Sequence, residues 1–427
     1  PVGSIELKGL SSEVLYFEDF QNQYGLKMEV IRHGKYKSAV EPFLQDKMSD
    51  ENRAQIKGLL DAVWTTISDE IVESRAISKK ALEKMVEELT VTDAKEAIAN
   101  GIIDALVYED DFEKSIKAAL EIDKDDSINS VEFYELNTQM KTFDSDLKDQ
   151  IAVIYANGPI LYTSGTEEVI GKKGLNQAFQ EVETNKNIKG AVLRIDSPGG
   201  DAMTSEIILN AMRKLKGKKP LVVSLGNIAA SGGYYIACLG DKIYASPMTI
   251  TGSIGVLAAF PNIRGLAERI GINAEQVNSH KNAMGYSLFE PLNDGFKNST
   301  KSAIEKVYTT FKSRVSEGRS LNMEKVENLS KGRIWSGKDA VENGLVDAIG
   351  GLEDAIQATA EMAAIENYNI DSYPKYENEF EYIFLDALSF IRFKIFNHPI
   401  EKFASELIKL SEMEGIQAII PFSINIE

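Results

Sequence analysis

An internal repeat is the feature that most restricts what this chain can fold into. The stretch KEAIANGIIDAL around Gly101 is matched by KDAVENGLVDAI around Gly344, 243 residues later. Upstream, VGSIE around Gly3 matches TGSIG around Gly252, and AVEPF matches LFEPL, both 249 residues later. Because these landmarks keep their order along the chain, we interpret the sequence as a duplicated domain.

The second copy alternates short apolar runs with stretches of helical spacing. The runs are IAVIYANGPI, GAVLRID, PLVVSLG and DKIYASP, each bounded by Gly, Pro or Asp, and the helical stretch is AMTSEIILNAMRKLKG. This alternation predicts βαβ units around a parallel sheet. Long helices are expected to flank each copy, within residues 53–72 and 296–331. The predicted fold class is therefore α/β, with two tandem βαβ domains and flanking helices.

The repeat also predicts the domain boundaries. The first copy covers residues 1–121, the polar stretch 122–149 is a linker crossed by one strand at VEFYEL, and the second copy covers 150–364. About a hundred residues of the second copy precede its GSI motif, against almost none in the first, so we expect the first copy to be incomplete in this chain. Residues 365–427 are predicted to be a helical extension, in which 378–396 form a packing or oligomer-contact helix rather than a membrane-surface helix.

Composition excludes several kinds of partner and site. Lys and Arg total 47 against 65 Asp and Glu, and a formal net charge of −18 disfavours binding to nucleic acid. Cys238 is the single cysteine, which rules out an intrachain disulfide and a multi-thiolate metal site. The three histidines lack the spacing of metal ligands, so we expect no metal and no cofactor.

Two glycine-rich junctions in the second copy could carry chemistry. In RIDSPGGDA, an apolar strand delivers Gly199 and Gly200 to a turn that opens a helix, where backbone N–H groups could point at a ligand. In AASGGYYIA, Ser231 could be an ordinary helix N-cap or a nucleophile. Because loops that follow neighbouring parallel strands share one crevice, the pair favours a nucleophile with an oxyanion hole from Gly232 and the first turn.

A nucleophilic serine needs a base, and the sequence leaves its identity open. His280 and His398 lie in polar turn contexts, and lysine is the known alternative base. The segment RHGKYKSAVEPF offers Lys35 and Lys37. In an extended segment these two residues project to the same face, so geometry does not choose between them.

Several motifs together resemble the signal peptide peptidase A family, also called protease IV, in its long form with two tandem copies of a ClpP-like fold. They are SPGG, AASGGYYIA, TGSIGV, YKSAVEPF and ENGLVDAIGG. The resemblance implies a Ser–Lys dyad, with Ser231 as nucleophile and Lys37 as general base. It also favours Gly200 over its neighbour as the oxyanion donor that acts with Gly232. Ser253 of TGSIG is either the serine that orients the lysine or a turn serine without that role.

The same resemblance implies a serine endopeptidase that cleaves signal-peptide remnants and other hydrophobic peptides. Lys37 corresponds to Tyr286 in the second copy, so one copy supplies the base and the other the serine. The family also implies a homo-oligomer, a tetramer, at the bacterial cytoplasmic membrane, with the catalytic part outside the cytoplasm and an anchor absent from this chain. The alternatives are a crotonase-like enzyme acting on acyl-CoA and an inactive scaffold of the same fold.

Overall fold

The computed structural model describes residues 3–132, 146–375 and 417–419 of the chain. The chain divides into two compact units: a smaller one of Pro1–Ser11 with Val63–Asp146, and a larger one of Ser12–Ala62 with Leu147–Glu427. The larger unit therefore combines residues 12–62 of the first copy with the whole second copy. Helix α2 (Asp50–Arg75) passes from one unit into the other.

The larger unit is built on an eight-stranded sheet whose central strands are parallel. Its strands run in the order β11, β9, β7, β5, β2 and β13, with β8 beside β7 and β12 beside β8. The central strands are β2 (Gln150–Asn157), β5 (Ile188–Ser197) and β7 (Leu221–Ala230), joined by parallel pairing. The others are β8 (Lys242–Ala245), β9 (Ile250–Gly252), β11 (Ile334–Ser336), β12 (Ala348–Ile349) and β13 (Asn369–Tyr373).

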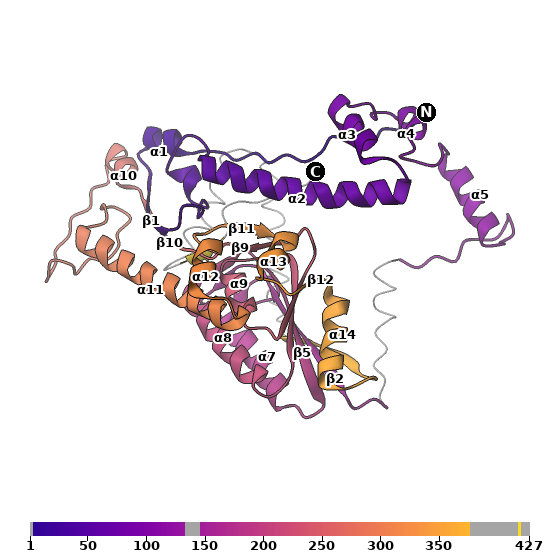
Figure 1. Ribbon diagram of the computed structural model, residues 1–427. Helices are drawn as coiled ribbons and strands as arrows, with labels where there is room; N and C mark the ends of the chain where they lie inside the picture. Colours follow the sequence, from indigo (N-terminus) through magenta and orange to yellow (C-terminus); the bar gives the residue numbers. More distant parts are fainter. Residues whose placement is uncertain (1–2, 133–145, 376–416, 420–427) are drawn as a thin grey trace. The chain divides into compact units, whose positions relative to one another are not determined.

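Helices cover both faces of this sheet because its central strands are apolar on both sides (Figure 1). On one face α7 (Lys172–Thr184), α8 (Ala202–Lys216) and α9 (Gly232–Ala237) share one apolar core with alternate residues of the central strands, such as Ile154. On the other face α14 (Leu352–Ala363) packs on the intervening residues such as Val153. The predicted α/β class is confirmed.

A second sheet brings the first copy to the second. Strand β1 (Lys27–His33) pairs antiparallel with β10 (Val256–Asn262) over seven residue pairs. Next to β10 lies β14 (Gln417–Ile419), followed by β6 (Gly199–Asp201), β3 (Ile160–Leu161) and β4 (Ile170–Gly171). Segments from three distant parts of the sequence therefore share one sheet.

The helices of the two copies repeat at nearly constant spacing along the chain. Helix α2 and α11 (Asp294–Arg319) each have 26 residues and begin 244 residues apart. The next three pairs begin 244, 243 and 243 residues apart: α3 (Lys79–Glu88) with α12 (Met323–Leu329), α4 (Ala94–Ala99) with α13 (Gly337–Asn343), and α5 (Glu109–Ala119) with α14. The predicted duplication and its flanking helices are thus present as matched secondary structure. Short helices α1 (Glu18–Tyr24), η1 (Glu41–Phe43) and α10 (Arg264–Arg269) complete the described elements.

Two local expectations differ from the structure. The extension expected to be helical from residue 365 begins with strand β13, which pairs in parallel with β2 and so belongs to the sheet of the second copy. The glycine turn before α8 forms the short strand β6, because Gly200 pairs with Ile160 before the helix begins. The predicted helix over 378–396 and most of the predicted VEFYEL strand lie outside the described residues.

Candidate active site

Ser231 lies at the junction between β7 and α9 in a backbone conformation that side chains rarely adopt. Its φ of 56° and ψ of −115° place it outside the ordinary allowed regions. Its N–H donates to the Gly252 carbonyl at 2.8 Å, and its carbonyl accepts from the Tyr235 N–H at 2.8 Å. Although the residue occupies the N-cap position, its hydroxyl caps no backbone N–H of α9. The hydroxyl is therefore held for another contact.

That contact is with Lys37. The Lys37 Nζ lies 2.7 Å from the Ser231 Oγ, 3.1 Å from the Ser253 Oγ and 3.2 Å from the Ser253 carbonyl oxygen. All three residues are fully buried. Burial without a compensating anion lowers the pKa of Lys37 well below the ordinary value for lysine.

The hydrogen-bond partners of Lys37 match those of a neutral amine. A neutral Nζ has two N–H donors and one lone pair. The donors can serve the carbonyl oxygen and the Oγ of Ser253, which leaves the lone pair for the Ser231 hydroxyl. The Ser253 hydroxyl can in turn donate to the Gly332 carbonyl at 3.5 Å. Each polar atom then has a partner without any charge in the cluster.

Lys35, the other lysine of the segment, points elsewhere. Its side chain is 56% exposed, and its Nζ lies 3.6 Å from the Glu51 carboxylate and 4.8 Å from the centre of the Tyr36 ring. The structure thus brings Lys37, and not Lys35, to Ser231.

Close backbone packing excludes water around Lys37. Gly332 has a φ of 82°, and a Cβ there would lie within 2.7 Å of the Lys37 backbone. A Cβ at Gly255 would lie 3.3 Å from the Lys37 Cδ. Since neither position has room for a side chain, glycine at both lets the second copy close directly over the lysine.

The polar residue Gln55 on α2 holds the loop that carries Lys37, a role that no sequence motif predicted. The Gln55 amide nitrogen donates to the Tyr36 carbonyl at 3.2 Å and to the Ser38 Oγ at 2.7 Å. The Gln55 amide oxygen accepts from the Ile334 N–H at 3.5 Å. Gln55 therefore links the loop that carries Lys37 to β11 of the second copy. In the sequence, Gln55 is a polar residue that follows Asn52 by about one helical turn near the start of α2. That spacing is also typical of a helix face exposed to solvent, so it did not indicate a role for Gln55.

The glycines expected to form an oxyanion hole lie beside one another. The Gly199 N–H donates to the Ser197 Oγ at 3.2 Å and is already used. A Cβ on Gly232 would lie 3.0 Å from the Gly200 nitrogen, which places these two backbones in contact. Gly232 is the first residue of α9, where the N–H has no partner within the helix. Gly200, with a φ of 151° and no room for a Cβ beside the Ile160 carbonyl, must be glycine.

The remaining predicted site residues are also accounted for. Ser253 has a positive φ of 51°, and its N–H donates to the Arg333 carbonyl at 2.7 Å. Tyr286, the counterpart of Lys37 in the second copy, is 37% exposed and donates its hydroxyl to the Pro261 carbonyl at 2.6 Å. The position that supplies the base in the first copy thus has an ordinary surface contact in the second.

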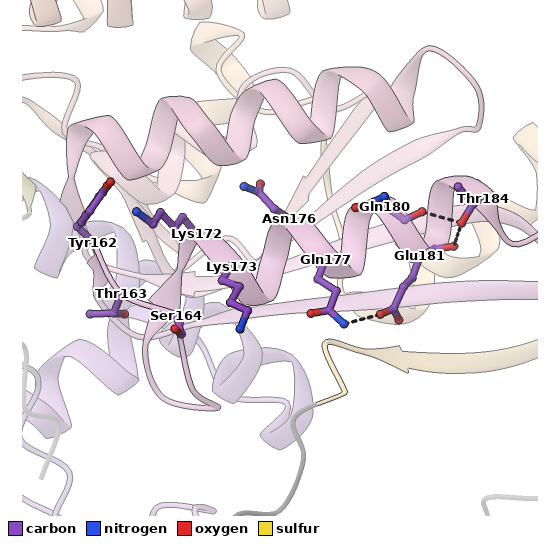
Figure 2. A pocket seen from close by; sticks show the side chains of 10 residues that line it. All are labelled: Tyr162, Thr163, Ser164, Lys172, Lys173, Asn176, Gln177, Gln180, Glu181 and Thr184. Atoms are coloured by element: carbon purple, nitrogen blue, oxygen red, sulfur yellow. Dashed lines mark hydrogen bonds between the residues drawn. The ribbon is translucent and has the colours of Figure 1, made fainter.

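An open groove of about 970 Å³ lies elsewhere in the larger unit, along the outer face of α7 (Figure 2). Its lining includes Tyr162, Lys172 and Asn176 and none of the predicted site residues. The Ser231–Lys37 pair lies instead in a closed environment.

The fold, with buried Ser231 at the carboxyl end of the parallel strand β7 and the Lys37 Nζ beside its hydroxyl, defines a ClpP-like α/β protein. A protein-family model described as "Peptidase family S49" matches residues 1–123 and 213–366 of the chain. The chain belongs to this peptidase family, as the sequence motifs predicted. The family match favours a peptidase over the crotonase-like alternative.

Three relatives illustrate the similarity. "Protease 4" of Haemophilus influenzae is 32% identical over 87% of this chain and 63% of its own length. "Serine protease SPPA, chloroplastic" of Arabidopsis thaliana is 32% identical over 84% of this chain and 54% of its own length. "Putative signal peptide peptidase SppA" of Enterococcus faecium is 33% identical over 52% of this chain and 67% of its own length. This chain therefore spans less than two thirds of the length of the first two.

Proposed function

We propose that this chain is a serine endopeptidase in which Ser231 is the nucleophile and Lys37 the general base. The observation that carries the proposal is the 2.7 Å contact between the Lys37 Nζ and the Ser231 Oγ inside a buried cluster. A lysine can act as a base at neutral pH only when its pKa is depressed, and burial lowers the pKa of Lys37. A protein that kept the fold only as a scaffold would have no need to bury a lysine without a counter-ion against a serine.

The proposed reaction proceeds through an acyl-enzyme. The Ser231 Oγ attacks the carbonyl carbon of the scissile peptide bond while its proton passes to the Lys37 Nζ. The resulting ammonium then gives this proton to the leaving amine as the C–N bond breaks. A water molecule attacks the ester in the second half, with Lys37 again accepting a proton and returning it to Ser231. Ser253 holds the amine in line throughout by accepting its two N–H groups.

The developing oxyanion would be bound by backbone N–H groups. Gly232 offers the N–H of the first residue of α9, which has no partner within the helix, and Gly200 lies in contact with it. Removing one such donor typically costs about 10² to 10³-fold in rate. The resemblance and the adjacency of the two glycines support this assignment.

An extended peptide chain is the substrate shape that the surrounding sheet supports. Strand β14 lies between β10 and β6, and its Ala418 is paired with Gly200. Since β6 also carries the proposed oxyanion donor, a chain that pairs with this strand lies next to the oxyanion site. A substrate peptide would bind in the same manner, by adding a strand to the sheet.

Family membership supports a proposal for the biological substrates, the location and the assembly of this protein. One relative is named a putative signal peptide peptidase, which supports cleaved signal peptides and other hydrophobic peptides as substrates. We also propose action at the bacterial cytoplasmic membrane, on its outer side, by a homo-oligomer such as a tetramer. Among the described residues, no helix is both long enough and apolar enough to cross a bilayer. Light scattering of the purified chain would test the oligomer.

Labelling with a fluorophosphonate reagent tests the proposed nucleophile. The reagent should modify the parent chain at one serine, and peptide mapping should identify Ser231. Ser197→Ala is a matched control, because this serine is also fully buried and ends the neighbouring strand β5. Labelling at another serine, or none at all with a chain that still cleaves peptides, would contradict the assignment.

A further inference from the structure

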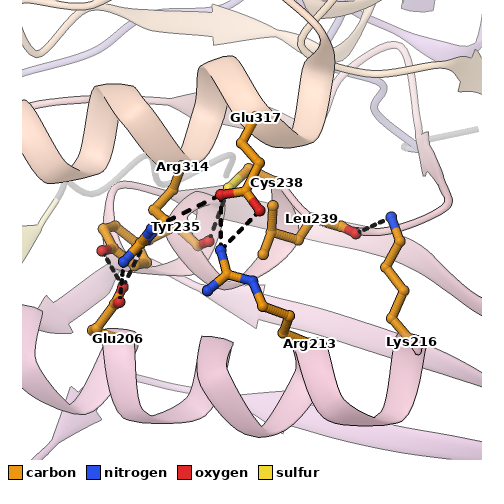
Figure 3. A network of polar contacts seen from close by, with 8 residues as sticks. All are labelled: Glu206, Arg213, Lys216, Tyr235, Cys238, Leu239, Arg314 and Glu317. Carbon is orange, nitrogen blue, oxygen red and sulfur yellow. Dashed lines mark hydrogen bonds and ion pairs between the residues drawn. The ribbon is translucent and has the colours of Figure 1, made fainter. Parts of the chain in front are cut away.

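Three side chains near the candidate site form a network that joins three helices (Figure 3). The Tyr235 hydroxyl donates to the Glu206 carboxylate at 2.5 Å. Arg314 donates to both oxygens of the same carboxylate, at 2.5 and 3.3 Å. Tyr235 comes from α9, Glu206 from α8 and Arg314 from α11.

The electrostatics favour a fixed arrangement of this network. Burial raises the pKa of Glu206, but hydrogen bonds from Arg314 and Tyr235 outweigh it and leave the pKa below its ordinary value. The carboxylate is therefore ionised at neutral pH and can accept from both partners at once. The ring of Tyr235 also packs on Phe311, with the ring centres 4.7 Å apart.

Two of the helices adjoin the groups expected to bind the oxyanion. Helix α9 begins at Gly232, directly after Ser231, and the Tyr235 N–H donates to the Ser231 carbonyl. Helix α8 begins two residues after Gly200. The hydrogen bond between Tyr235 and Glu206 thus connects the second turn of α9 to the first turns of α8.

We propose that Tyr235 and Glu206 are positioning residues that fix the separation between the Gly232 and Gly200 N–H groups. This inference rests on the proposed serine peptidase function. Gly232 opens α9, and Gly200 lies in β6 directly before α8. The separation of their N–H groups therefore depends on contacts between α8 and α9. Because an oxyanion hole acts on the transition state, a small change in this separation should affect kcat more than KM.

A second ion pair in the same region provides a control. The Arg213 guanidinium donates to both oxygens of Glu317, at 3.0 and 2.8 Å. This pair joins α8 to α11, as the pair between Glu206 and Arg314 does, and Glu317 also lies 3.8 Å from Arg314. Among the described residues, neither Arg213 nor Glu317 forms a hydrogen bond or ion pair with α9. Its loss should therefore change stability without moving the two oxyanion donors.

The test uses the full chain and three substitutions. Tyr235→Phe removes one oxygen and keeps the ring packing, Glu206→Gln removes the ion pair, and Arg213→Gln is the control. Tyr235→Phe and Glu206→Gln should each lower kcat on the order of tenfold, with KM nearly unchanged. Affinity for a peptide boronate, which forms a tetrahedral adduct with the serine, should fall in parallel, whereas the control should retain parental kcat and boronate affinity.

The outcomes separate this inference from the proposed function. If the parent chain is not labelled at Ser231 and cleaves no peptide, the proposed function fails. If the parent is active but Tyr235→Phe has the kcat and boronate affinity of the Arg213→Gln control, the positioning role fails. A loss that appears only in KM would also overturn it, since substrate binding would then be the affected step. Circular dichroism checks that each variant is folded. If Glu206→Gln is unstable, Tyr235→Phe, which keeps the ring packing, still tests the proposal.

Discussion

The Lys37 Nζ and the Ser231 Oγ lie 2.7 Å apart although 194 residues separate them in the chain. The contact depends on the pairing of β1 with β10, which brings a loop of the first copy against the second. The first copy supplies the lysine and the second the serine, and the second copy has Tyr286 at the position that corresponds to Lys37. The duplication has therefore produced one asymmetric site from two related halves.

Ser231→Ala should abolish peptide hydrolysis and leave the fold intact. Removing the hydroxyl leaves only a small space, whereas loss of the nucleophile should lower kcat by about 10⁴-fold or more. A fluorogenic peptide assay with circular dichroism would measure both effects. Turnover near the parental rate in a folded variant would show that another group attacks the substrate.

Lys37→Met should lower kcat by about 10² to 10⁴-fold, the usual contribution of general-base catalysis. Methionine keeps the approximate length of the buried chain but cannot accept a proton. Lys35→Met is the matched control, because the Lys35 side chain is exposed and contacts Glu51 rather than the site. Steady-state kinetics on both variants would decide, and equal losses from the two would place the base elsewhere.

The pH dependence of kcat/KM should report a depressed lysine. Protonated Lys37 cannot accept the Ser231 proton, so kcat/KM should rise with pH through the pKa of Lys37 and then level off. Because burial lowers this pKa, the rise should occur well below the value of ~10.4 for free lysine. A rate that keeps rising up to that value would mean that the base is solvated.

The same pKa shift should make stability depend on pH. Between the folded pKa of Lys37 and ~10.4, the unfolded chain holds a proton that the folded chain has released. The free energy of unfolding should therefore rise with pH across this window, by about 1.4 kcal/mol per unit of pKa depression. Denaturant titrations at several pH values should show this slope in the parent, and Lys37→Met should lack it. Parallel slopes would mean that Lys37 titrates normally when folded.

Ala418→Pro should raise kcat/KM for peptide substrates. Proline has no N–H, so it weakens the pairing of β14 with Gly200 and with its neighbours in β6. If substrates add a strand in the place of β14, this weakening should lower KM for a peptide substrate. Kinetics on the full chain would show it, and an unchanged KM would indicate that peptides bind elsewhere.

The sheet of the second copy was predictable because its signals are local. Apolar runs bounded by Gly, Pro or Asp gave the central strands, and the repeat gave the paired long helices. Strands β1, β13 and β14 were not predicted, since each is stabilised by pairing with strands far away in the sequence. Periodicity within a segment does not carry that information.

Some residues of the candidate site could be identified from their neighbours in the sequence, whereas others depend on tertiary contacts. Ser231 was found from its small neighbours, which leave space around one hydroxyl. Lys37 could not be separated from Lys35 by strand geometry, because what distinguishes them is burial under Gly255 and Gly332. The role of Gln55 was not predicted, because it depends on tertiary contacts. Its amide nitrogen contacts the Tyr36 carbonyl, and its amide oxygen contacts the Ile334 N–H.

The β1–β10 pairing has a consequence for the integrity of the chain. Cleavage within residues 122–132 would leave Lys37 and Ser231 on separate fragments, yet the seven paired residues of β1 and the Gln55 contacts would still join those fragments. Activity should then survive a nick that denaturing electrophoresis resolves as two polypeptides. A gene split at this linker would encode two different subunits, each inert alone and active when combined.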